Sequence, residues 1–206
     1  MQVFPTTVTR RMALRAAMVA GIALTVLGAS GSSGNATTAE EAFASKAGAH
    51  ALQTAAYGGS AQQKVDRFKD LLRQYSNVKE VALFSLGKYE KQLPSNRANE
   101  YFELVEDFAA KLFASYSGDF MGREVQVLRS APRTANDIVV DSRILYNDDR
   151  RPAPVKWLVA KRGNKLNIYD VNIQGVWLSL FIQQKFVSIL KRSKGDFDPL
   201  FAYLKE

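Results

Sequence analysis

Apolar residues recur at helical spacing through the first half of the chain. The Ala-rich segment from Thr38 to Tyr57 predicts a helix that ends at Gly58-Gly59. Ser60 is the predicted N-cap of a second helix, in which Val65, Phe68, Leu72 and Tyr75 share one face. Asn77 is predicted to cap a third, short helix carrying Val78, Val81, Ala82 and the Phe84-Ser85-Leu86 run.

The next predicted helix, residues 95–117, has an unusually wide apolar face. Ser95 is its predicted N-cap, and Gly118 ends it. The face is formed by Tyr101, Val105, Phe108, Leu112 and Tyr116, and is widened by Phe102, Leu104, Ala109 and Phe113. An apolar stripe this broad and aromatic is expected to face something large and apolar.

The second half of the chain changes to the alternation that is typical of strands. Four strands are predicted, at residues 124–129, 137–146, 155–160 and 166–173. The last two flank a hairpin turn at Arg162-Gly163-Asn164-Lys165. Two helices follow, one from Val176 to Arg192 and one from Asp196, its predicted N-cap, to Leu204.

This order of elements predicts an α+β fold. Strands that follow one another through short turns form an antiparallel meander most simply. We therefore expect a curved four-stranded antiparallel sheet with several helices on one face, enclosing an apolar pocket. No linker divides residues 37–206, which are expected to form a single domain.

The first 36 residues have the three-part layout of a secretory signal peptide. A basic cluster at Arg10, Arg11 and Arg15 precedes an apolar run from Ala16 to Ala29, followed by small and polar residues. The apolar run is short for a bilayer-spanning helix, which needs ~20 residues. A retained membrane anchor is the alternative interpretation. The Arg-Arg pair also resembles the twin-arginine export signal, so both that route and the ordinary secretory route stay open.

Composition excludes several kinds of chemistry. The 206 residues include no Cys and one His, which removes thiol catalysis, disulfides and His-rich metal sites. No phosphate-binding Gly loop or hydrolase motif is present. The net charge of +8 suits anionic lipid, nucleic acid or an acidic protein. Because no nucleic-acid recognition signature accompanies the charge, nucleic acid is not expected as a partner. No catalytic residue, metal or cofactor is expected.

Asp170 is the carboxylate that stands out, because it lies inside the apolar strand 166–173. A buried carboxylate needs partners. The structural interpretation is a hydrogen-bonded or Arg-paired side chain, and the catalytic alternative is a general base.

Several segments of the chain resemble, in order, the MlaC/toluene-tolerance family of periplasmic phospholipid-binding proteins. Residues 165–176, read Lys-Leu-Asn-Ile-Tyr-Asp-Val-Asn-Ile-Gln-Gly-Val, are similar to that family's W-K-x-Y-D-V-x-x-E-G-V stretch. Residues 84–89 resemble its F-x-L-G-R-Y-W segment, and residues 116–127 its Y-A … E-x-V-x-V segment. Phe186 with Ile189-Leu190, and then residues 195–204, resemble its C-terminal pattern. Together these segments cover residues 40–206.

The chain departs from the family pattern at four positions. Leu166 replaces the usual Trp, Gln174 the usual Glu, Trp177 the usual Ser and Gln183 the usual Arg. The changes at Trp177 and Gln183 put contacts with a headgroup or a partner in doubt. They indicate a divergent branch, for which a hopanoid-associated subgroup is one candidate.

The resemblance implies a soluble periplasmic carrier that binds lipid tails and is not an enzyme. Its implied partners are a phospholipid or related lipid, an inner-membrane ABC transporter bearing an MCE-domain ring, and an outer-membrane lipoprotein complex. The predicted lining of the lipid site consists of Tyr101, Val105, Phe108, Leu112, Leu158, Tyr169, Val171, Ile173, Val176, Phe181 and Phe186.

Two other interpretations stay open from the sequence. One is an enzyme for a small apolar substrate, which would need Asp170 or Tyr169 to face a cavity with a perturbed pKa. The other is an interaction module whose core is fully packed by its own side chains.

Overall fold

The computed structural model describes residues 37–206, in which helices come first, then a run of strands, and then two more helices. The predicted export segment, residues 1–36, lies outside the described residues. The elements are α1 (Ala39–Ala55), α2 (Ala61–Tyr75), α3 (Val78–Ser85), α4 (Ala98–Tyr116), β1 (Glu124–Pro132), β2 (Asp137–Leu145), β3 (Ala153–Arg162), β4 (Lys165–Ile173), β5 (Val176–Trp177), α5 (Leu178–Arg192) and α6 (Asp198–Lys205). Short 3₁₀ turns, η1 (Gly87–Gln92), η2 (Ser95–Arg97) and η3 (Ser117–Phe120), connect them.

Helix starts follow local side-chain chemistry. Thr38 and Ser60 each form a capping box. The N-cap side chain accepts a hydrogen bond from the backbone amide of the third helical residue, and the side chain of that residue accepts one from the N-cap backbone amide. Asn77 caps α3 as predicted. The long helix begins at Ala98 instead of Ser95, because residues 95–97 form the 3₁₀ turn η2.

The sheet is an antiparallel meander in the order β1-β2-β3-β4-β5. The predicted number of four strands was wrong: Val176 and Trp177 form a fifth, very short strand instead of starting a helix, and they pair with Ile173 and Asn172. The turn between β4 and β5 places Gln174 and Gly175 at φ 50° and 95°, which reverses the chain within two residues.

One face of the sheet carries helix α1. Gly48 of α1 sits so close to the sheet that a Cβ there would lie 2.9 Å from Val125 and 3.1 Å from Trp157. Leu158 and its register partner Asp170 point to the opposite face, because side chains alternate along a strand. Both are nevertheless buried. This short stretch of β3 and β4 is therefore enclosed on its second face as well.

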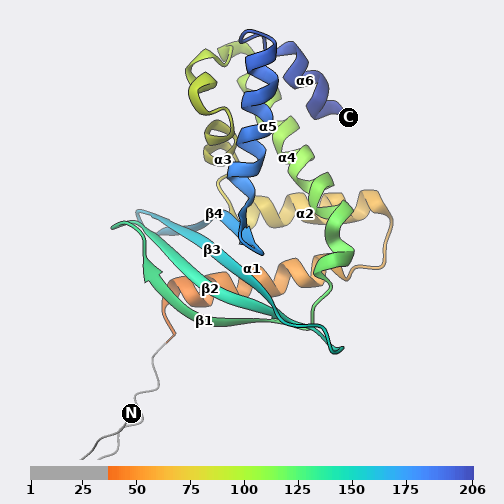
Figure 1. Ribbon diagram of the computed structural model, residues 1–206, viewed down its shortest axis with the longest axis vertical. Coiled ribbons are helices and arrows are strands. Elements are labelled where there is room, and N and C mark those ends of the chain that lie inside the picture. The colour runs from red at the N-terminus through yellow and green to blue at the C-terminus, as the bar shows by residue number, and fades with distance from the viewer. Residues whose placement is uncertain (1–36) are drawn as a thin grey trace, which may run out of the picture. The chain divides into compact units, whose positions relative to one another are not determined.

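The buried apolar residues form two clusters. The sheet cluster joins the sheet to α1, α2 and the second half of α4, and comprises Ala44, Ala47, Leu52, Val65, Phe68, Leu71, Tyr75, Ala110, Val125, Val140, Ile144, Ala153, Val155, Trp157, Val159 and Ile168. The helix cluster joins α3, η1, the first half of α4, α5 and α6, and comprises Ala82, Leu86, Tyr89, Tyr101, Val105, Phe186, Ile189, Leu190, Phe197, Leu200, Phe201 and Leu204. Figure 1 shows α3, α5 and α6 gathered at the β4 side of the sheet, with α1 running along it.

Candidate functional site

The predicted lining residues divide into three groups in the structure. Four of them meet at the junction of α4 and α5: Tyr101, Val105 and Phe186 are buried in the helix cluster, and Phe108 packs against it. The ring centroids of Phe108 and Phe186 lie 5.7 Å apart. The structure therefore brings the aromatic residues of these two helices into contact.

Tyr101 forms the polar anchor of this junction. Its hydroxyl lies 2.7 Å from the Ser85 hydroxyl and donates to the Ala82 carbonyl at 3.0 Å. Burial raises the pKa of Tyr101, and the hydrogen bond with Ser85 acts in the opposite direction. The Tyr101 side chain is fully enclosed, so it can hold neighbouring residues in place but has no exposed surface for a ligand to contact.

The second group lies on β3 and β4 and does not share one surface. Val171 packs against the sheet cluster, whereas Leu158 points to the other face and is buried there. Tyr169 and Ile173 are half-buried, and the Tyr169 ring contacts Phe84 of α3 with centroids 5.9 Å apart. A β-bulge between Leu158 and Val159 changes the alternation here.

The third group is exposed apolar surface at the start of α5. Val176 is 50% and Phe181 55% exposed. Leu180, which sequence reasoning missed, is 43% exposed beside them. Leu112, the remaining predicted lining residue, lies on α4 and is half-buried. Three large apolar side chains within six residues, following a tight turn, are the sequence signal that could have identified this surface.

Asp170 fixes the point where this apolar segment enters α5. Its carboxylate accepts from the backbone amide of Ser179 at 3.0 Å, from the Ser179 hydroxyl, and from the Val171 amide at 2.8 Å. The N-cap residue of α5, Trp177, makes no side-chain cap, so Asp170 satisfies an amide of the first helical turn from the neighbouring strand. Burial raises the pKa of Asp170, although the bonds from Ser179 oppose that shift.

This arrangement favours the structural interpretation of Asp170. A general base must reach a substrate proton, whereas three donors of the chain itself already occupy this carboxylate. The pKa of Tyr169 is also raised, chiefly by burial. Within residues 37–206, no group of three or more His, Asp or Glu side chains is arranged to hold a metal ion.

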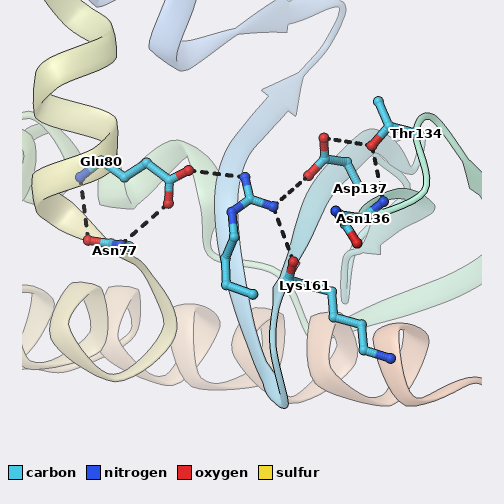
Figure 2. Close-up of polar contacts among 7 residues, drawn as sticks. Asn77, Glu80, Thr134, Asn136, Asp137 and Lys161 are labelled. Carbon is cyan, nitrogen blue, oxygen red and sulfur yellow. Dashed lines mark hydrogen bonds and ion pairs between the residues drawn. The ribbon is translucent and has the colours of Figure 1, made fainter.

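Gln183, one of the departures from the family pattern, ties α5 to α3. Its side-chain amide donates to the Phe84 carbonyl at 2.6 Å. The Gln therefore satisfies a carbonyl at the end of α3. A second polar link joins α3 to the sheet: the Arg162 guanidinium of β3 bonds Glu80 of α3 at 3.0 Å and Asp137 of β2 at 3.1 Å. Figure 2 shows Glu80 and Asp137 with their polar neighbours Asn77, Thr134 and Asn136.

Comparison with known proteins agrees with this architecture. The model of the family described as MlaC protein matches residues 45–206. The chain belongs to the MlaC family. A search of curated proteins finds no match. Among solved structures, the MlaC-family chain resembles the phospholipid-binding protein from Ralstonia solanacearum, determined in complex with a phospholipid, with a TM-score of 0.66. The two sequences are 22% identical, and the match covers 80% of this chain and 93% of that one. None of the helices in the described part of this MlaC-family chain is long and apolar enough to cross a membrane.

Proposed function

We propose that this protein is a periplasmic carrier that binds the acyl chains of a phospholipid and moves the lipid between membranes. The observation that carries the proposal is the MlaC-family match over residues 45–206. The shared fold with a protein solved in complex with a phospholipid supports it. Residues 1–36 would serve as the export signal, and the domain from residue 37 onward would work outside the cytoplasm.

The physical problem for such a carrier is the cost of exposing hydrocarbon to water. Each methylene group costs ~0.8 kcal/mol, so two tails of ~16 carbons cost on the order of 20 kcal/mol. A carrier has to replace the membrane interior with apolar side chains. It also has to release the lipid, so its affinity must stay close to that of the membranes it serves.

The tails would lie against those predicted lining residues that still have free surface. These are Phe108, Leu112, Tyr169, Val171, Ile173, Val176 and Phe181, which are half-buried or exposed. Tyr101, Val105, Leu158 and Phe186 are already enclosed and would form the supporting wall behind them. Covering Val176, Leu180 and Phe181 would remove exposed apolar surface from water, at about 25 cal/mol for each Å².

The donor and acceptor partners in this proposal are membrane complexes. We propose an inner-membrane ABC transporter with an MCE-domain ring on one side and an outer-membrane lipoprotein complex on the other. The protein itself is proposed to carry out no chemical step.

Lipid extraction tests the proposal directly. The full chain is expressed in a host that exports it, purified without detergent and extracted with organic solvent for mass spectrometry. We expect about one phospholipid for each protein molecule, and exchange of that lipid with labelled vesicles. Protein that holds no lipid and takes none from the vesicles would instead favour an interaction module with a closed core.

A further inference from the structure

A depression lies between α5 and α6. It is at the end of α5 that is remote from the sheet in Figure 1. The depression has a volume of about 420 Å³. Its lining residues are Lys185, Ile189, Arg192, Ser193, Pro199 and Tyr203. The spacing along each helix explains how they meet, because residues three to four positions apart share one helix face.

The depression combines an apolar floor with a basic rim. Ile189 is 8% exposed and belongs to the helix cluster, and the Tyr203 ring packs against Phe108 with centroids 5.6 Å apart. Lys185 and Arg192 are exposed at the rim, with the Lys185 ammonium 5.1 Å from the centre of the Tyr203 ring. The floor is therefore packed against the helix cluster, and the charged side chains above it are exposed to solvent.

Within residues 37–206, the rim cations have no acidic partner. Arg73, Arg97 and Arg162 each bond a carboxylate of the chain. Among the side chains that the structure describes, neither Lys185 nor Arg192 makes an ion pair; Arg192 donates only to the Ser188 hydroxyl, at 3.2 Å. The lining contains no Asp or Glu. The depression thus presents uncompensated positive charge around an apolar centre.

We propose that this depression is a docking site for an acidic segment of a protein partner, one that inserts an apolar side chain between two carboxylates. Complementary charge brings such a segment to the rim, and a pocket with a packed floor holds its anchor residue. A concave surface suits a protruding side chain, whereas the surface of a membrane offers no such protrusion. The site is separate from the exposed surface at Val176 and Phe181, and its occupancy does not depend on bound lipid.

The test uses the purified, exported chain and two fluorescent peptides. The probe is a short Glu-rich peptide with one central Phe, and its control carries Gln at each Glu position. We expect saturable binding of the acidic probe by fluorescence anisotropy, weakened by salt. In the double variant Lys185→Glu with Arg192→Glu, the affinity should fall at least about tenfold.

Lys46→Glu is the matched control, because Lys46 is exposed on α1 and away from the depression. It should bind the probe like the parent chain. Equal affinity for the Gln peptide, or an unchanged affinity of the double variant, would overturn the proposal. A third result would also overturn it: the peptide never binds, whereas the parent chain binds phosphatidylglycerol vesicles and the double variant does not. Both altered side chains are exposed, so unchanged melting temperature and lipid content separate this test from that of the carrier function.

Discussion

Ser179 donates both its backbone amide and its hydroxyl to the carboxylate of Asp170. The two residues sit on either side of the β4–β5 turn, where the chain leaves the sheet and enters α5. This contact sets the position of the helix that carries Leu180 and Phe181.

Replacing Asp170 with Asn should lower the free energy of unfolding by about 1–2 kcal/mol. The Asn side chain keeps one acceptor oxygen but turns an amide group toward donors that have no other acceptor. Urea denaturation measures the loss. Ser179→Ala, which removes only the hydroxyl donor, should cost less. If Asp170→Asn unfolds like the parent chain and abolishes a turnover reaction, the structural interpretation is wrong.

The cost of Asp170→Asn should also depend on pH. Burial raises the pKa of Asp170 in the folded state above its ordinary value of 3.8. The folded state therefore holds the proton more tightly, so this group contributes full stability below its unfolded pKa and loses it as pH rises through the raised pKa. Comparing the unfolding free energies at about pH 3 and about pH 7 should show a smaller cost at the higher pH. A cost that increases with pH would mean that the pKa is lowered instead.

Phe181 and Phe186 should separate lipid binding from folding. Phe186 is fully buried, so Phe186→Ala should cost about 3–5 kcal/mol of stability through the cavity that it leaves. Phe181 is 55% exposed, so Phe181→Ser should change stability by less than about 0.5 kcal/mol. We expect Phe181→Ser to reduce the amount of co-purified phospholipid, measured by mass spectrometry. Unchanged lipid content in that variant would remove Phe181 from the site.

Gly48→Ala should destabilise the protein. An Ala gains about 1 kcal/mol of helix propensity over Gly, but its Cβ would lie 2.9 Å from a Val125 methyl carbon and 3.1 Å from the Trp157 ring. Overpacking of this kind costs about 1–3 kcal/mol, so we expect a net loss of about 1 kcal/mol in thermal or urea unfolding. Gly118→Ala is the control, since its Cβ would meet nothing within 4 Å. Similar effects at both positions would contradict the tight packing of α1 on the sheet.

The sequence predicted the N-caps of α2 and α3, because capping is decided locally. It misplaced the starts of α4 and α5, where a 3₁₀ turn and a short strand come first. Ser60 and Asn77 act as the expected N-caps. The expected cap at Asp196 is displaced: its carboxylate accepts from the Asp198 amide, but α6 begins at Asp198. The short strand β5 was missed because Gln174 at positive φ is not the residue that a two-residue hairpin usually selects.

The site was harder to predict than the fold, for a reason that lies in the strands. The bulge between Leu158 and Val159 shifts the alternation of side chains, so the residues of β4 on either side of it do not follow one simple pattern. Leu158 and Val171, both predicted to line the site, face opposite sides of the sheet, because the register partner of Leu158 is Asp170, the neighbour of Val171. Exposure is likewise decided by tertiary packing: Phe181 and Phe186 have similar sequence surroundings and opposite burial.

Helix α4 supplies residues to both apolar clusters, Tyr101 and Val105 to one and Ala110 to the other. Because one continuous helix belongs to both clusters, unfolding of either cluster destabilises the other. Unfolding of α5 and α6 would remove the packing partners of the first half of α4. Fraying of α4 would then expose the sheet cluster to water. The domain should accordingly lose its two cores in one cooperative, all-or-none transition rather than in separate steps.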